Sequence, residues 1–74
     1  MDEAKLELVQ SWFRKASHDL QAARFLGTTD PHLIDVAMFH CHQAAEKALK
    51  GYLVFWDQEP ENTDDLGLLL DRAL

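Results

Sequence analysis

The stretch that decides the fold is Asp30–Trp56, which reads DPHLIDVAMFHCHQAAEKALKGYLVFW. It opens with Asp30 as an N-cap and Pro31 at the first helical position, where the missing N–H of proline has no consequence. Apolar residues then recur at steps of three and four, the spacing of one face of an α-helix. They are Leu33, Ile34, Ala37, Cys41, Ala44, Ala45, Ala48, Tyr52, Phe55 and Trp56. We predict a single helix of about 25 residues, roughly 38 Å long, against which the rest of the chain packs.

A row of polar residues runs along the same helix beside this apolar face. His40, Gln43, Lys47 and Lys50 follow one another at steps of three and four, and Glu46 forms an i,i+4 pair with Lys50. Hydrogen-bond donors in a row beside an apolar groove suit a phosphate or the face of a partner protein. A solvated helix flank is the alternative that the spacing leaves open.

Two flanking helices are expected. Residues 4–26 form the first, with Gly27 as its stop and Thr28 and Thr29 as a short linker, so that it runs antiparallel to the long helix. Its apolar face is expected to consist of Leu6, Val9, Phe13, Ala16, Leu20 and Ala23, widened by Trp12 and Leu26. Lys15 and Asp19 are expected to pair on the polar side of this helix.

The third helix follows a polar segment that contains Pro60, and Asn62 or Thr63 is its expected cap. Its apolar positions are Leu66, Leu69, Leu70, Ala73 and Leu74. This pattern is still running at Leu74, so we expect the chain to be a fragment, with its leucine-rich edge covered by a further helix or a partner.

Composition limits the function classes. At 74 residues the chain is one domain, and its net charge of −6 argues against general affinity for nucleic acid or an anionic membrane. A local basic strip from Arg14, Lys15, Lys47 and Lys50 remains compatible with that charge. The single Cys41 indicates a buried small hydrophobe in a reducing compartment. No apolar run approaches eighteen residues, so we predict a cytoplasmic protein without a membrane span.

No catalytic group emerges from the spacing. His40 and His42 are two residues apart, whereas a helical zinc pair needs a spacing of four, and no metal or cofactor is predicted. Arg14 and His18 could hold a phosphate and move a proton, but two solvated side chains on one helix face explain the pair more simply. A Gly-rich phosphate loop, a nucleophile elbow and paired carboxylates are all absent from the sequence.

Two segments resemble the HEPN domain family: WFRKASHDLQAARFL (12–26) and FHCHQAAEKALKGYL (39–53). The family's A-x-x-D-L-x-x-A pattern is matched by Ala16, Asp19, Leu20 and Ala23. Its F-H-x-Q-Q-A-A-E-K-x-L-K pattern is matched by Phe39, His40, Gln43, Ala44, Ala45, Glu46, Lys47, Leu49 and Lys50, and His42 replaces a glutamine.

The resemblance implies an all-α, antiparallel up-and-down bundle of four to five helices, three of them represented in a single domain over residues 1–74 that lacks its C-terminal helices. It also implies a homodimer, a nucleotidyltransferase partner, often in a toxin–antitoxin pair, and association with nucleotide or RNA. On this basis the candidate ligand-binding residues are His40, Gln43, Glu46, Lys47 and Lys50.

Two alternatives stay open. The first is a metal-independent ribonuclease toxin whose catalytic Arg…His motif lies beyond Leu74, because Arg14 to His18 is one step too short and lies in the wrong helix. The aspartate in Thr63-Asp64-Asp65-Leu66 also stands where the family often has a histidine. The second is a purely structural dimerisation module.

Overall fold

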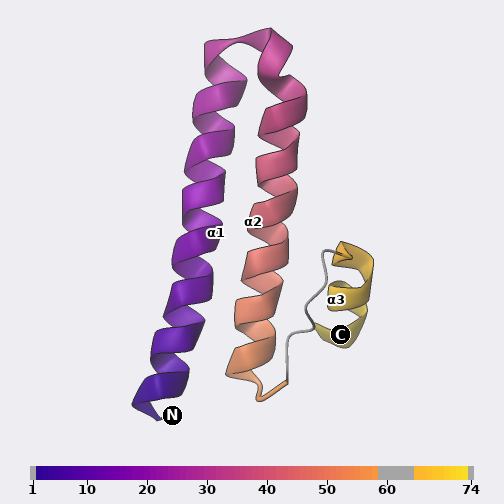
Figure 1. Ribbon diagram of the computed structural model, residues 1–74. Coiled ribbons are helices and arrows are strands. Elements are labelled where there is room, and N and C mark those ends of the chain that lie inside the picture. The colour runs from indigo at the N-terminus through magenta and orange to yellow at the C-terminus, as the bar shows by residue number, and fades with distance from the viewer. Residues whose placement is uncertain (1, 59–64, 74) are drawn as a thin grey trace.

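Three helices and one short turn make up the structure, a computed structural model that describes residues 2–58 and 65–73 (Figure 1). They are α1 (Glu3–Thr29), the 3₁₀ turn η1 (Pro31–Leu33), α2 (Ile34–Phe55) and α3 (Leu66–Ala73). Helices α1 and α2 lie antiparallel as a long hairpin, and α3 packs on the side of α2 that faces away from α1. The described residues contain no strand, and the all-α prediction is confirmed. No helix within them is long and apolar enough to cross a membrane.

The α1–α2 seam is built from small residues. Its buried members are Val9, Ala16, Asp19 and Ala23 on α1, and Ala37, Ala44, Gly51 and Val54 on α2. They recur in steps of three, four or seven residues, the spacing that keeps the same face of each helix in contact with the other helix. A Cβ added at Gly51 would lie 3.1 Å from Trp12 Cβ and 3.3 Å from the Phe13 ring, so a larger residue there would require one of these neighbours to move.

Helix α1 extends past its expected end. Gly27 is helical, and the described glycines include none with a positive φ, so it does not act as a left-handed stop. The hydroxyl of Thr28 donates to the carbonyl of Arg24 at 2.8 Å, and that of Thr29 donates to the carbonyl of Phe25 at 2.6 Å. Both hydroxyls thus bond back to carbonyls of the preceding turn while the helix continues through the two threonines. The predicted Thr28–Thr29 linker is wrong because both threonines are helical; α1 ends at Thr29, and the chain becomes extended at Asp30.

The long helix is shorter than predicted at both ends. Asp30 caps its start as expected, accepting the N–H of His32 at 3.0 Å, but the first turn is 3₁₀ and the α-helix begins at Ile34. At the other end the N–H of Gln58 donates to the carbonyl of Leu53 at 2.8 Å, and the N–H of Asp57 donates to the carbonyl of Val54 at 3.0 Å. With Asp57 at a φ of 60°, this is a Schellman ending whose left-handed position is occupied by aspartate instead of glycine.

Helix α3 begins with a cap from Asp65, whose carboxylate accepts the N–H of Leu68 at 3.1 Å. The predicted caps Asn62 and Thr63, and Leu74, lie outside the described residues. Leu69 is fully buried, as its place in the apolar pattern predicts, whereas Leu70 is 46% exposed.

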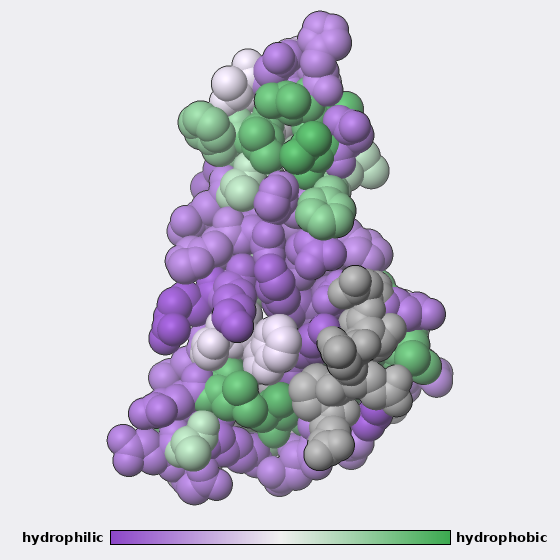
Figure 2. Space-filling view, in the orientation of Figure 1, coloured by the Kyte–Doolittle hydropathy of each residue, from purple (hydrophilic) through white to green (hydrophobic). Residues whose placement is uncertain are grey.

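Several residues of the predicted apolar faces are exposed. On α1, Leu6, Phe13 and Leu20 are 43%, 44% and 55% exposed. The buried side of this helix carries Val9, Ala16, Asp19 and Ala23 instead. Cys41, predicted to be buried, is exposed, since the α2 side of the seam steps from Ala37 through His40 to Ala44. The exposed residues of the predicted apolar face also include Ile34, Ala45, Tyr52 and Phe55 on α2, and Trp56 directly after it. Figure 2 shows the result as apolar surface at both ends of the hairpin with a hydrophilic band between them.

Candidate functional site

The centre of the site is Asp19, a carboxylate inside the α1–α2 seam. It lies three residues after Ala16 and four before Ala23, so the helix turns it towards α2 with these two alanines. Only 9% of the residue is exposed. A buried charge is costly unless it is paired and hydrogen-bonded, so the residues that face Asp19 decide whether this arrangement is stable.

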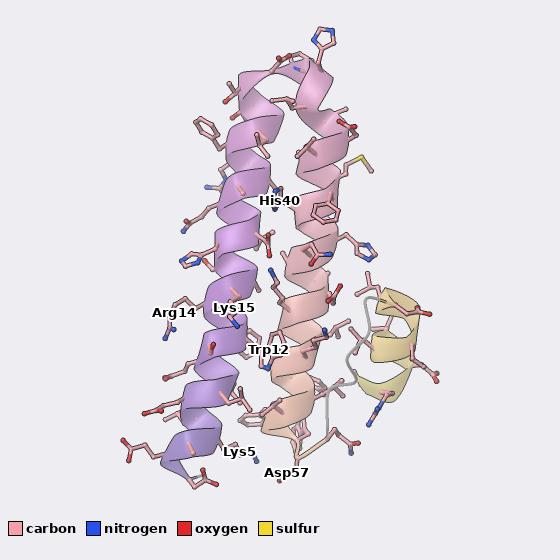
Figure 3. The ribbon with its side chains drawn as sticks, in the orientation of Figure 1. Lys5, Trp12, Arg14, Lys15, His40 and Asp57 are labelled. Atoms are coloured by element: carbon pink, nitrogen blue, oxygen red, sulfur yellow. The ribbon has the colours of Figure 1, made fainter. Side chains whose placement is uncertain are left out.

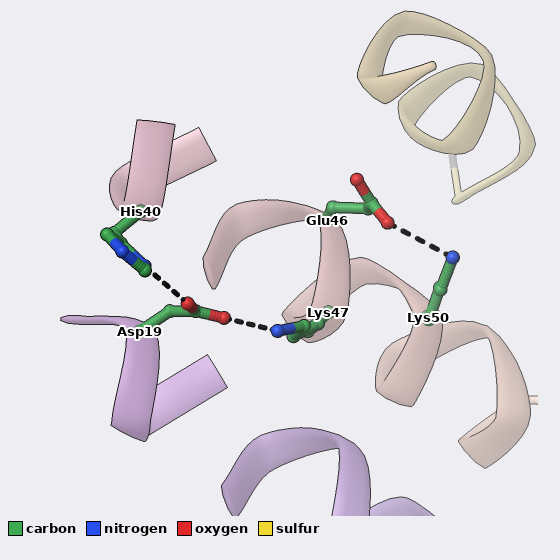
Figure 4. Close-up of polar contacts among 5 residues, drawn as sticks. All are labelled: Asp19, His40, Glu46, Lys47 and Lys50. Atoms are coloured by element: carbon green, nitrogen blue, oxygen red, sulfur yellow. Dashed lines mark hydrogen bonds and ion pairs between the residues drawn. The ribbon is translucent and has the colours of Figure 1, made fainter. Parts of the chain in front are cut away.

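Two residues of α2 meet this carboxylate from either side (Figure 4). His40 Nδ1 lies 2.8 Å from one oxygen, and Lys47 Nζ lies 2.5 Å from the other. The two residues are seven positions apart on α2, two helical turns, which lets a single carboxylate bridge them. Their side chains are 29% and 26% exposed, so each also reaches solvent. We call Asp19, His40 and Lys47 the Asp19 cluster.

The Asp19 cluster holds its protons in a defined arrangement. Burial alone raises the pKa of Asp19, but the hydrogen bonds from Lys47 and His40, with the attraction of their charges, outweigh it and hold the pKa below its usual value. Asp19 is therefore ionised at neutral pH and accepts the Nδ1 proton of His40. This leaves Nε2 as the ring nitrogen that can meet a ligand, and Lys47 keeps two further N–H donors.

A second ion pair lies one turn further along α2. Lys50 Nζ is 3.1 Å from Glu46 Oε1, in the i,i+4 arrangement that the sequence predicts, and Figure 4 shows Glu46 turned towards α3. Both are buried, at 3% exposure for Glu46 and 7% for Lys50. The second oxygen of Glu46 has no hydrogen-bond partner within the described residues. Lys50 Nζ also lies 5.4 Å from the Trp12 ring, in cation–π range.

The predicted polar row therefore divides into two parts. His40 and Lys47 come together on Asp19 and remain accessible, with the half-buried Gln43 between them on α2. Glu46 and Lys50 form their own buried pair, which leaves little of either side chain for a ligand.

Sequence reasoning missed Asp19 as a site residue. It placed Asp19 on the polar side with Lys15, whereas Lys15 lies 5.3 Å from the Trp12 ring and Asp19 faces α2. The signal was present in the sequence, because an aspartate stands in a row of small residues at helical spacing. Arg14 and His18 are both exposed, and within the described part of the chain no ion pair or hydrogen bond joins them.

The described residues form no cluster of metal-binding side chains. Among residues 2–58 and 65–73, no three histidine, cysteine, aspartate or glutamate side chains are placed to hold a metal ion. The chemistry of the Asp19 cluster is thus that of charge-assisted hydrogen bonds and a proton-carrying imidazole.

Comparison with known proteins identifies one family. The model of the HEPN domain matches residues 9–73, a span that includes the Asp19 cluster and all of α2 and α3. No curated protein and no solved structure matches the chain.

Proposed function

The chain belongs to the HEPN domain family, and from this premise we propose that it is a nucleotide- or RNA-binding module that acts with a nucleotidyltransferase partner in a toxin–antitoxin pair. Family membership supports a nucleotide- or RNA-related role in general. The nucleotidyltransferase partner and the toxin–antitoxin pairing are further parts of the proposal. The binding site described in the next paragraph gives the residues that would contact the nucleotide.

The observation that carries the proposal is the position of Asp19. One buried carboxylate orients an imidazole and an ammonium on the same side of the hairpin, and each keeps hydrogen-bonding capacity that Asp19 does not use. A phosphate oxygen accepts charge-assisted hydrogen bonds from donors of this kind. In the proposal Lys47 and His40 contact the phosphate of a nucleotide, and the amide of Gln43 donates from the helical turn between them.

Glu46 and Lys50 take a different part in the proposed site. Their ion pair holds the Lys50 ammonium beside the half-buried Trp12 ring, so they shape the wall of the site next to Lys47. Since only 9% of the Lys50 side chain is exposed, we assign it a supporting role.

Calorimetric titration with ADP tests the site. Lys47→Ala should weaken binding about tenfold, because it removes one charge-assisted hydrogen bond of roughly 1.5 kcal/mol. Lys5→Ala is the matched control, since Lys5 is also a partly exposed lysine paired with a carboxylate, Asp57, at 2.7 Å. Binding should be weak and should decrease with salt. An affinity unchanged in Lys47→Ala, with its helical circular dichroism intact, would remove the site from the proposal.

Homodimerisation is proposed as well, and the exposed apolar surface supports it. Fourteen large hydrophobic residues of the described chain are at least 39% exposed, and Figure 2 shows apolar surface gathered at both ends of the hairpin. Light scattering should give about twice the mass of one chain. A Gln43→Ala, Lys47→Ala variant that becomes monomeric would place the polar row in the dimer interface, and one that stays dimeric while losing ADP would support the ligand site.

A further inference from the structure

Two of the four histidines lie within hydrogen-bond distance of an aspartate, and their surroundings differ. His32 Nδ1 is 3.1 Å from Asp30, and its side chain is 94% exposed. His40 Nδ1 is 2.8 Å from Asp19, and its side chain is 29% exposed. Figure 3 shows His40 on the side of α2 that faces α1. The His40 pair is therefore set into the α1–α2 seam, whereas the His32 pair lies in solvent.

The His40 ring is restrained at two points. The buried carboxylate of Asp19 accepts the proton on Nδ1, so the free electron pair of the ring is on Nε2. The Phe39 ring stands at 78° to the imidazole, with the ring centres 5.6 Å apart in an edge contact. A histidine whose orientation is fixed by a carboxylate on one nitrogen has the other nitrogen available as a nucleophile.

Lys47 brings positive charge to the same place. Its ammonium contacts the second oxygen of the Asp19 carboxylate, so one buried group holds both the ammonium and the imidazole. Two of its N–H donors remain for the oxygens of an incoming phosphate. Phosphoryl transfer depends mainly on the position of the acceptor atom and on positive charge near the phosphoryl oxygens. The Asp19 cluster supplies both.

We propose that Nε2 of His40 accepts the γ-phosphoryl group of a nucleoside triphosphate, which makes this histidine a phosphorylation site. The electron pair of Nε2 forms the new N–P bond. The bond from the γ-phosphorus to the bridging oxygen breaks, and its electron pair leaves on the nucleoside diphosphate. The Nδ1 proton stays in place, and ionised Asp19 balances the positive charge that the ring gains. The inference rests on the proposed nucleotide site and adds a reaction to it.

Incubation of the purified protein with ATP and Mg²⁺, followed by intact-mass measurement and phosphorus NMR, tests the inference. The protein should gain the mass of one phosphoryl group, and NMR should place that group on Nε2 of His40. The product should be lost in dilute acid and kept in alkali, as an N–P bond is. His40→Gln should abolish the product. His32→Gln is the matched control and should leave the rate unchanged, because its aspartate pair is exposed.

Asp19 and Lys47 are tested by different measurements. Asp19→Asn should slow phosphorylation at least tenfold and should spread the phosphoryl group over both ring nitrogens, because an amide does not select one tautomer. A merely structural role for Asp19 would reduce the folded fraction without changing which nitrogen reacts. Lys47→Ala should slow the reaction about a hundredfold with the phosphoryl group still on Nε2. Circular dichroism measures the folded fraction of each variant.

Titration of the same samples with ADP separates this inference from the proposed function. ADP binding without phosphorylation would overturn the inference and leave the binding site standing. Absence of both would overturn the two together. Phosphorylation of His32 and His40 at similar rates would also overturn the inference, because any histidine beside an aspartate would then react. The geometry predicts phosphorylation of His40 alone in a protein that binds ADP.

Discussion

Replacing Asp19 with asparagine tests the electrostatic centre of the hairpin. The substitution keeps the side-chain volume nearly constant but removes the negative charge that Lys47 and His40 share. The Lys47 ammonium is then left beside a neutral amide at the α1–α2 seam. Removing one partner of a buried ion pair costs about 3–5 kcal/mol, because the other charge stays buried and uncompensated.

The expected loss is smaller than that range. Lys47 and His40 are 26% and 29% exposed at their side chains, so both regain part of their hydration in the variant. We therefore expect Asp19→Asn to lower the free energy of unfolding by about 2 kcal/mol at pH 7. For a domain of this size such a loss corresponds to a decrease of roughly 10 °C in melting temperature.

The loss should depend on pH in a defined direction. The folded-state pKa of Asp19 lies below its unfolded value of about 3.9, so its stabilising contribution is present above the unfolded pKa and is lost as pH falls through the folded pKa. The difference between wild type and Asp19→Asn should therefore be larger at pH 5 than at pH 3 and should shrink below pH 4.

Urea denaturation followed by circular dichroism at pH 7, 5, 4 and 3 measures this difference. Glu7→Gln, an exposed carboxylate on the same helix, is the matched control and should change stability by less than about 0.5 kcal/mol. A difference for Asp19→Asn below about 0.5 kcal/mol at pH 7, or one that stays constant down to pH 3, would refute the reasoning.

Three further predictions concern separate parts of the structure, each measured by thermal or urea denaturation. Gly51→Ala should destabilise the protein by about 1 kcal/mol, because the added Cβ would lie 3.1 Å from Trp12 Cβ on α1. Gly27→Ala should stabilise it by about 0.5–1 kcal/mol, because the nearest atom to the added Cβ is 3.6 Å away. Effects of the same sign in the two variants would contradict this packing. Asp57→Gly should stabilise the protein by about 0.5–1 kcal/mol, because glycine adopts a φ of 60° without strain. The ion pair with Lys5 that is lost contributes little, since the Asp57 side chain is 82% exposed. A lower melting temperature in this variant would contradict the prediction. Lys50→Ala should lower the free energy of unfolding by about 3 kcal/mol, because it leaves the buried carboxylate of Glu46 unpaired. Adding Glu46→Leu should restore part of that stability. No recovery in the double variant would show that the loss is not electrostatic.

Much of the architecture follows from local chemistry that the sequence displays. The Asp30–Pro31 start, the three-and-four spacing of apolar residues and the short connection to the first helix together predict an antiparallel helical hairpin, and this is the structure observed. The Glu46–Lys50 pair follows from helical spacing in the same way. The match to the HEPN domain covers residues 9–73, which include most of α1 and all of α2 and α3.

Rotation of the helices about their axes was not predictable from periodicity. Apolar residues cover more than half the circumference of α1, so the pattern is compatible with a seam centred on Phe13 and Leu20 as well as with one centred on Ala16 and Asp19. The structure adopts the second orientation, in which Ala16, Asp19 and Ala23 are buried while Phe13 and Leu20 are 44% and 55% exposed. Asp19 then becomes buried, and its pairing with His40 and with Lys47, across 21 and 28 residues of sequence, follows from that orientation.

The most direct measurement of the central claim is the ring-nitrogen NMR spectrum of the four histidines during titration with ADP. The account predicts that His40 carries its proton on Nδ1 in the free protein and that its Nε2 resonance moves in a saturable way as ADP binds. His18, His32 and His42, which are exposed outside the Asp19 cluster, serve as internal controls and should stay in place. A His40 resonance that does not move while ADP binds, or a His40 protonated only on Nε2, would contradict the account.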